Sequence, residues 1–315
     1  MPLFGRFFDY SKPGKGVDPD APKKRPFFLF FELLWRKFSR FLSLNFVYSI
    51  CMLPLALMVN WLMYAAMYEW VGADAVAEEV APSLMFSFAI SFFNLPAPVW
   101  SLLLLVSALA LGPLTCGITY ITRCWTQEKH ADLSDLFDHA KRNLKQGLFL
   151  GILDIAVYAL LMRNLLAVID YDLVGGFSGT MLSFSRNFSI IGLVVYSFMR
   201  LYTYQMAVTF ELKITHILKN AWLFSVMGLF RNILATAVFA ATFFVFFQLN
   251  FLVEVVFYFI FSFSFWAFAN NFITFPLIKK LMMPKEEPIE GGEGPEDAPG
   301  ELPDQVDDRL FKKDE

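Results

Sequence analysis

The stretch "FLSLNFVYSICMLPLALMVNWLMYAAMY" (Phe41–Tyr68) decides the fold class, because it contains no Asp, Glu, Lys or Arg and is long enough to cross a bilayer. About 20 consecutive apolar residues form a membrane-spanning helix. The rest of the 315-residue chain follows the same pattern, with 57% hydrophobic residues, 38 of them Phe, and only 17% charged residues. Soluble domains carry roughly 25% charged residues. We therefore predict an all-α fold, a polytopic transmembrane helical bundle.

Apolar runs predict six membrane spans in a domain of residues 41–280, between an N-terminal segment (1–40) and an acidic tail (281–315). The predicted spans are Phe41–Tyr68, Trp100–Ile121, Gly147–Ile169, Phe188–Phe210, Gly228–Asn250 and Phe251–Phe275. Pro54 should kink the first span. Leu84–Leu95 is too short to span and is predicted to be interfacial or re-entrant. The last two spans should meet in a tight hairpin.

The acidic tail is rich in Pro and Gly and poor in apolar residues, which predicts disorder. It is either a plain solvated tail or an interaction segment.

Basic residues alternate between the two ends of the predicted spans. They are frequent before the first span, in loops 122–146 and 211–227, and after the sixth span, but loop 69–99 has none. The loop before the fourth span has only Arg186. Because cytoplasmic loops are enriched in Lys and Arg, we predict a multi-pass protein of the cell membrane with both termini in the cytoplasm.

The polar stretch "LSDLFDHAKRNLKQG" (Leu133–Gly147) is predicted to be a short amphipathic helix that leads into the third span. Its apolar residues recur with helical spacing at Leu133, Leu136, Phe137, Ala140 and Leu144. Asp132 or Ser134 is expected to cap the helix, and Asp138 to pair with Lys141 or Arg142. The candidate docking residues on this helix are Asp135, Asp138, His139, Lys141, Arg142 and Asn143.

The next cytoplasmic loop, "ELKITHILKNAWLF", shows the same helical spacing of apolar residues and adds His216, Lys219 and Asn220 as candidate docking residues. His139 to Asn143 and His216 to Asn220 both read His-x-x-(Arg/Lys)-Asn. The match indicates either an internal repeat, with spans two and three corresponding to spans four and five, or a chance similarity.

Ionisable residues inside spans usually face the interior of a bundle, because charge is costly in lipid. We predict that Asp154 of span three pairs with Arg200 of span four, since both lie on the cytoplasmic side. The pair either fixes helix register or lines a substrate or proton path. Arg163, near the outer end of span three, is predicted to snorkel to the membrane surface.

Catalytic and cofactor motifs are absent from the sequence: it has no HExxH, GxSxG, P-loop or dinucleotide glycine pattern. We predict no enzyme activity, no cofactor and no metal site. Nucleic-acid binding is not expected either, since there is no basic domain face. Cys51, Cys116 and Cys124 have no CxxC spacing and are expected to be apolar core residues.

The N-terminal stretch "RPFFLFFELLWRKFSRFLSLN" (25–45) combines aromatic and basic residues, which predicts an interfacial helix in contact with membrane lipids. Lys23, Lys24, Arg25, Arg36, Lys37 and Arg40 either attract anionic lipid or only set the topology.

Several of these stretches together resemble the YesL-like family of bacterial membrane proteins. The similarity lies in Asn45 and Pro54, in Gly112 followed by Pro113, and in "LSDLFDHAKRNLKQ", with Asp135, Phe137, Asn143, Lys145 and Gln146; "ITHILKNAWLF" adds Lys219, Asn220 and Ala221. This chain departs from the family pattern in the long segment between Pro54 and Gly112. The resemblance implies an accessory or regulatory component associated with carbohydrate ABC transporter subunits.

Two functions follow from these expectations. The first is an accessory or regulatory role in carbohydrate uptake, with the two polar helices as docking surfaces. The alternative is a stand-alone transporter or channel, with Asp154, Arg200 and Arg163 along its path. The chain lacks the EAA-x3-G coupling loop expected of an ABC permease itself.

Overall fold

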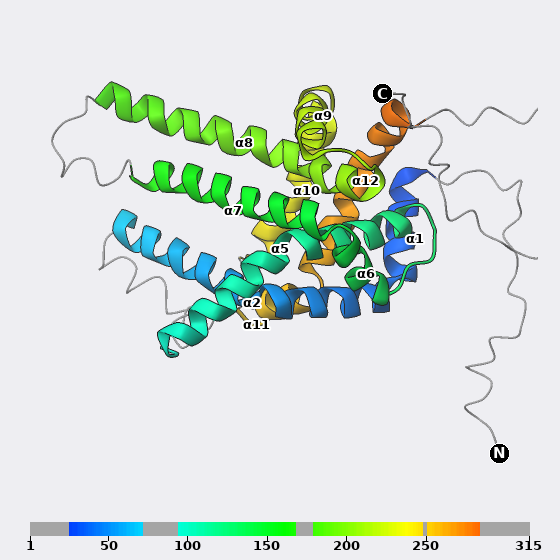
Figure 1. Cartoon of the computed structure of the whole chain (residues 1–315), viewed down its shortest axis with the longest axis horizontal. Coiled ribbons are helices and arrows are strands. Elements are labelled where there is room, and N and C mark those ends of the chain that lie inside the picture. The colour runs from blue at the N-terminus through cyan, green and yellow to red at the C-terminus, as the bar shows by residue number, and fades with distance from the viewer. Residues whose placement is uncertain (1–24, 72–93, 168–178, 248–250, 284–315) are drawn as a thin grey trace, which may run out of the picture.

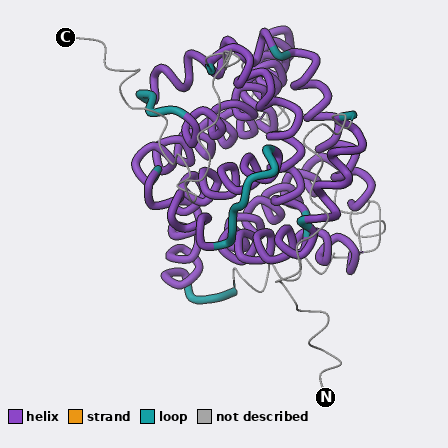
Figure 2. The backbone as a smooth tube through the Cα atoms, turned by 90° about the vertical axis from the view of Figure 1, so that its right-hand side faces the viewer, coloured by secondary structure: helices purple, strands orange, loops and turns teal. Residues whose placement is uncertain are grey.

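The computed structural model describes residues 25–71, 94–167, 179–247 and 251–283, and every regular element within these ranges is a helix (Figures 1 and 2). The prediction of an all-α fold is therefore confirmed. The helices are α1 (Pro26–Arg36), α2 (Phe38–Val71), α5 (Ala97–Thr126), α6 (Ser134–Arg142), α7 (Leu144–Ala167), α8 (Gly179–Thr209), α9 (Ile214–Met227), α10 (Leu229–Phe247), α11 (Phe251–Ile260) and α12 (Ser262–Met282).

Three of the described helices are long and apolar enough to cross a membrane: Phe38–Val59 of α2, Ala97–Thr126 and Leu144–Leu165 of α7. A fourth span is possible if α9 and α10 count as one, although they bend by 90° at their junction. α8 is long enough but carries Arg200 and Gln205 among its apolar residues. Multiple apolar helices are consistent with a multi-pass membrane protein, and the number of six spans stays a prediction.

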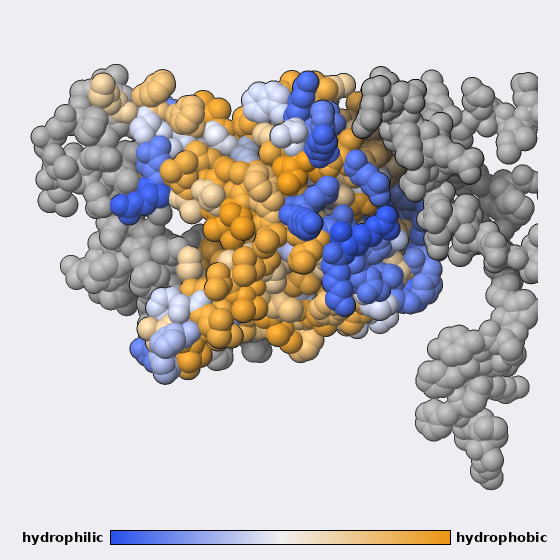
Figure 3. All heavy atoms as spheres, in the orientation of Figure 1, coloured by the Kyte–Doolittle hydropathy of each residue, from blue (hydrophilic) through white to orange (hydrophobic). Residues whose placement is uncertain are grey.

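The bundle is built around α5, which packs against α1, α2, α6, α7, α8 and α12. In Figure 1, α2, α5, α7 and α8 run along the long axis of the molecule. The short α1 lies across the end of the bundle at which α2 begins, close to the end of α12. The loop from α5 to α6 lies at the same end, where exposed hydrophilic side chains gather (Figure 3).

Glycines let α5 and α7 cross with their backbones in contact. A Cβ added to Gly112 would lie 1.7 Å from the carbonyl oxygen of Gly147. Gly147 and Gly151 form a GxxxG pair on α7, and a Cβ on Gly151 would lie 2.6 Å from the amide nitrogen of Gly112. Small residues at this spacing allow close helix packing in membranes. Pro113 lies at the same crossing, since a Cβ added to Gly147 would lie 2.9 Å from the Cα of Pro113.

The sixth predicted span is not one continuous helix, because α11 and α12 are separated by Phe261, which lies outside the α region with φ −139° and ψ −31°. The side chain of Asn45 in α2 accommodates this break. It donates to the carbonyl oxygen of Tyr258 (2.7 Å) and accepts from the amide of Ser264 (3.0 Å). Backbone groups freed inside a membrane need such partners, and Asn45 is fully buried.

The other predicted spans shift at their ends. α8 begins at Gly179, earlier than the predicted Phe188, and α5 ends at Thr126, beyond the predicted Ile121. Pro54 lies inside α2, as predicted. The predictions for the apolar run Leu84–Leu95 and for the acidic tail fall almost entirely on residues outside the described ranges. The tip of the last hairpin also lies outside them.

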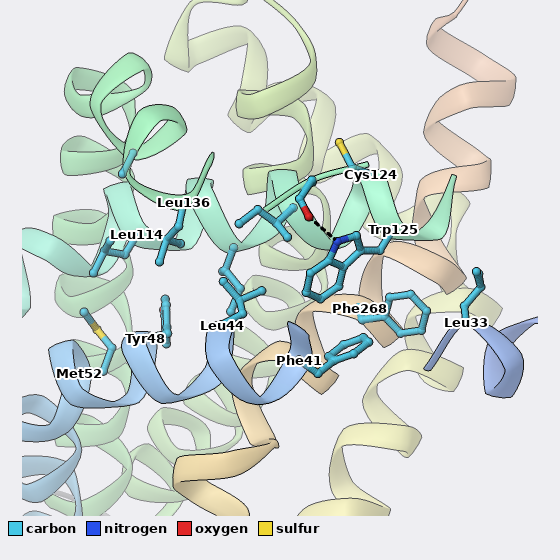
Figure 4. Close-up of a cluster of buried hydrophobic side chains, with 14 residues drawn as sticks. Leu33, Phe41, Leu44, Tyr48, Met52, Leu114, Cys124, Trp125, Leu136 and Phe268 are labelled. Carbon is cyan, nitrogen blue, oxygen red and sulfur yellow. Dashed lines mark hydrogen bonds between the residues drawn. The ribbon is translucent and has the colours of Figure 1, made fainter. Parts of the chain in front are cut away.

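The N-terminal helix α1 packs on the last helix, although the two are far apart in the sequence. Phe30 contacts Phe268 and Phe272 of α12, with ring centroids 5.3 and 5.2 Å apart, and Leu33 is fully buried. The opposite side of α1 exposes Phe27, Phe28, Phe31 and Trp35. The cluster of buried side chains next to this contact joins α2, α5, α6 and α12 (Figure 4).

Candidate functional site

The Asp154–Arg200 pair joins α7 to α8, as the sequence predicts. The Nε of Arg200 donates to Oδ2 of Asp154 at 2.8 Å. Two tyrosines of α8 also donate to the same carboxylate: Tyr196 to Oδ1 and Tyr204 to Oδ2, each at 2.7 Å. Asp154 therefore accepts three short hydrogen bonds, which compensates for its removal from water.

Helical spacing explains this cluster. Tyr196, Arg200 and Tyr204 follow one another at intervals of four residues, so all three project from the same face of α8. The guanidinium of Arg200 also lies 5.4 Å from the ring centre of Tyr204, within cation–π range. Next to the cluster, the hydroxyls of Tyr158 and Ser197 lie 3.2 Å apart. The ion pair was predicted from the sequence, but the two tyrosines were not, although their spacing of four residues from Arg200 places them on the same helix face.

The two partners differ in exposure. The side chain of Asp154 is 6% exposed and that of Arg200 is 37% exposed. Because all the described contacts of Asp154 are short and come from one helix face, the carboxylate acts as a staple between α7 and α8. The terminal nitrogens of Arg200 make no bond to Asp154, so the guanidinium can take a further acceptor. Arg163 is exposed in the last turns of α7, and its snorkelling to the membrane surface stays a prediction.

A helix forms within the predicted stretch 133–147, but α6 ends at Arg142 and Leu144 already belongs to α7, because the helix breaks at Asn143. Only part of the predicted apolar face is buried. Leu136 and Ala140 pack on α5, whereas Leu133, Phe137 and Leu144 are 36, 44 and 53% exposed. The close packing depends on α5, since a Cβ added to Gly117 would lie 2.2 Å from the carbonyl oxygen of Leu136. The exposed apolar side chains lie beside a polar face that carries the exposed residues Asp138, Lys141 and Arg142.

Two of the candidate docking residues on α6 serve in packing, which corrects the sequence prediction. The ring of His139 stacks on Tyr120 of α5 at a centroid distance of 3.3 Å, and Asn143 donates to the carbonyl oxygen of His139 at the end of the helix (3.0 Å). Burial, and then the neighbouring Arg142, lower the pKa of His139 below its usual value. A neutral, stacked imidazole is therefore expected at neutral pH.

The predicted charge pairs and cap of α6 also differ from the structure. Arg142 approaches Glu211 at 3.9 Å, and no ion pair joins Asp138 to Lys141 or Arg142 in the described part of the chain. The residue before the helix is Leu133, which has no capping side chain. Instead, Asp135 accepts from the amide of Asp132 at 2.8 Å, which places its half-buried side chain against the preceding loop.

The second candidate docking helix, α9, buries Ile217 and Ala221 and exposes His216 and Lys219, while Asn220 is half-buried. The His-x-x-(Arg/Lys)-Asn motif therefore occupies different places in the two helices. It ends α6, where Asn143 is the C-terminal cap, but lies inside α9, which continues to Met227. This difference favours a chance similarity over an internal repeat.

Two ion pairs at the end of the bundle form a clamp that the sequence did not predict. Arg36 pairs with Glu128 at 2.8 Å, and Arg40 approaches Asp132 at 3.5 Å. Behind these charges, the buried Trp125 donates to the carbonyl oxygen of Ala131 at 3.1 Å (Figure 4). The clamp ties the α5–α6 loop to α1 and α2. Its signal in the sequence was the matched spacing of four residues between the two arginines and between the two carboxylates.

In the described ranges, no group of three or more His, Cys, Asp or Glu residues lies close enough to hold a metal ion. Cys116 and Cys124 are buried and Cys51 is half-buried, all as free thiols.

The chain matches no protein-family model, no curated protein and no solved structure.

Proposed function

We propose that this chain is a six-span protein of the cell membrane, with both termini in the cytoplasm, that acts as an accessory or regulatory component of carbohydrate uptake. The three apolar helices supply three spans, and α8, α10 and the pair α11–α12 would supply the others. The orientation is supported by the end of the bundle shared by α1, α6 and the end of α12 (Figure 1). Exposed basic residues there include Arg36, Lys129, Lys141, Arg142, Lys145, Lys279 and Lys280.

The polar face of α6 is the observation that carries the docking role. This helix is held on α5 by Leu136 and Ala140, and it presents Phe137 together with Asp138, Lys141 and Arg142. An exposed aromatic ring surrounded by charged side chains is the pattern of an interaction surface, with a large apolar anchor and a polar rim. Behind this surface, the ring of His139 stacks on Tyr120 and the side chain of Asn143 caps the end of α6.

The expected partners are subunits of a carbohydrate ABC transporter. This part of the proposal rests on the resemblance to the YesL-like family around Asn45, Gly112 and Asp135–Gln146. In this chain, the same residues have definite structural contacts. Asn45 holds the break before α12, Gly112 permits the α5–α7 crossing, and Gln146 donates to the carbonyl oxygen of Leu212 at 2.9 Å.

A stand-alone transporter or channel is the second candidate, and the partial exposure of Arg200 favours it. An intramembrane guanidinium with free nitrogens is a typical ligand of a solute path. The hydrogen bonds of Asp154 argue against that role in this conformation. Each of its carboxylate oxygens already accepts a hydrogen bond at 2.7–2.8 Å from a side chain of α8.

Co-purification with carbohydrate ABC transporter subunits from the same membrane tests the proposal. The double substitution Lys141→Glu with Arg142→Glu should abolish capture, since both side chains are exposed. Within the described residues, Arg142 alone of the two has an ion pair, to Glu211 at 3.9 Å. The matched control is Lys279→Glu with Lys280→Glu, which reverses the same charge at the same end of the bundle but on α12. Solute uptake by the purified protein alone in liposomes would establish the second candidate instead.

A further inference from the structure

A groove of about 420 Å³ lies between the start of α2, the end of α5 and the start of α6. Its volume falls within the range of roughly 300–1,000 Å³ that is usual for small-molecule sites. The residues that line it are Ser39, Arg40, Ser43, Leu44, Ile121, Trp125, Asp132, Leu133 and Ser134. Neither the docking role nor the ion pair of α7 and α8 uses this groove.

The groove has an apolar floor and a polar rim. Leu44, Ile121 and Trp125 lie beneath the groove and are each at most 1% exposed, so the surface open to a ligand is mainly the rim. The rim carries three hydroxyl groups, one guanidinium and one carboxylate. This combination suits a small headgroup that carries both a negative and a positive charge.

The two charges of the rim are only loosely paired. Arg40 lies 3.5 Å from Asp132, and its other polar contacts are also long: 3.5 Å to the carbonyl oxygen of Ala131 and 3.3 Å to His130. Well-formed pairs of this kind lie at about 2.7–2.9 Å, and Arg36 with Glu128 reaches 2.8 Å close by. The side chains of Arg40 and Asp132 are 38% and 53% exposed. Both can therefore turn toward a ligand without leaving a buried charge.

The position of the groove points to a lipid. The apolar span of α2 begins at Phe38 and that of α5 ends at Thr126, so the groove lies at the level where a bilayer has its headgroups. Phe46 of α2, one turn further into the span than Ser43, is 53% exposed and is available to acyl chains. Leu133 of the rim is 36% exposed.

We infer that this groove binds the headgroup of an aminophospholipid, that is, a phosphodiester that carries a primary ammonium group. Arg40, with the hydroxyls of Ser39 and Ser43, holds the phosphate, and Asp132 accepts from the ammonium. The zwitterionic headgroup satisfies both charges of the rim. An anionic headgroup without an amine would place its phosphate near the carboxylate of Asp132, and a choline headgroup has no N–H group to donate to it.

Native mass spectrometry of the full-length protein in detergent tests this inference, with titration of phosphatidylethanolamine, phosphatidylglycerol and phosphatidylcholine that share the same acyl chains. We expect phosphatidylethanolamine to bind at least about tenfold more tightly than phosphatidylcholine, which corresponds to one charge-assisted hydrogen bond. Asp132→Asn should remove that preference, and Arg40→Gln should weaken all three lipids. Arg36→Gln is the matched control, because Arg36 pairs outside the groove and does not line it.

Equal binding of phosphatidylglycerol and phosphatidylethanolamine would overturn the inference, as would an unchanged preference in Asp132→Asn. Either result would show that the basic end of the bundle attracts lipid by charge alone. Because Arg40 and Asp132 also belong to the clamp, Ser43→Ala serves as a milder variant. Its hydroxyl bonds only the carbonyl oxygen of Ser39 within the described structure, at 3.2 Å. This variant should weaken phosphatidylethanolamine binding while the protein keeps its melting temperature.

Discussion

Replacing Asp154 by Asn tests the staple between α7 and α8 most directly, because the side chain keeps its size but loses its charge and exchanges one acceptor oxygen for an N–H donor. The free-energy change follows from the three bonds that the carboxylate accepts. Polar bonds between membrane helices contribute about 0.6 kcal/mol each on average, so the bonds alone amount to roughly 2 kcal/mol. Leaving a buried charge unpaired costs about 3–5 kcal/mol. Because Asn keeps one acceptor oxygen for the guanidinium of Arg200, the charge does not lose every partner, and we expect a loss of about 2–3 kcal/mol.

Steric trapping in bicelles gives the free energy of unfolding needed for this comparison. The control is a double-mutant cycle, in which Arg200→Gln and the double variant are measured under the same conditions. Because the double variant leaves no unpaired charge, it should be less destabilised than the sum of the two single changes, with a coupling of about 1 kcal/mol or more. Additive effects, or a loss below about 0.5 kcal/mol in Asp154→Asn, would refute the staple.

Three further changes test other parts of the bundle. Gly112→Ala should destabilise the protein by about 1–3 kcal/mol or prevent folding, because its Cβ would lie 1.7 Å from the carbonyl oxygen of Gly147. Gly192→Ala is the control, since its Cβ meets only the side chain of Leu161, at 3.1 Å. It should lower the stability far less in the same thermal unfolding assay. Asn45→Leu leaves the amide of Ser264 without its acceptor and should cost about 1–3 kcal/mol, seen as faster amide exchange in the first turn of α12. The lowered pKa of His139 disfavours its charged form in the folded state, so the stability from this group is fully present above the ordinary value of 6.5 and falls as the pH drops below it. The protection factors of the α6 amides, which compare each exchange rate with the intrinsic rate at the same pH, should fall between about pH 7.5 and 5.5. His139→Phe should remove that fall, and protection factors that do not change with pH would contradict the assignment.

Local patterns in the sequence were sufficient for the fold class and for much of the site. The apolar run at Phe41–Tyr68 required a helix in a membrane, since a bilayer leaves few other ways to satisfy backbone groups. The ion pair of Asp154 and Arg200 was predictable for a similar reason, because two opposite charges on neighbouring apolar helices lower their desolvation cost when they pair. The α6 helix followed from the periodic spacing of its apolar residues.

Contacts between distant segments were not predictable from such patterns. His139 was assigned to the polar face of α6, but the ring of Tyr120 in α5 covers it. The sixth span was predicted as continuous, since nothing near Phe261 signals a break that Asn45, more than 200 residues away, makes possible. The clamp of Arg36 and Glu128 likewise joins residues 92 positions apart.

The sequence by itself determined that this protein is a bundle of apolar helices with its basic loops at one end, because hydropathy and charge act residue by residue. Only the tertiary structure decided which side chains meet in space. The three donors around Asp154, the glycine crossing of α5 and α7, and the groove with Arg40 and Asp132 all depend on how helices lie against each other, and packing geometry is a property of pairs of helices that no single segment contains.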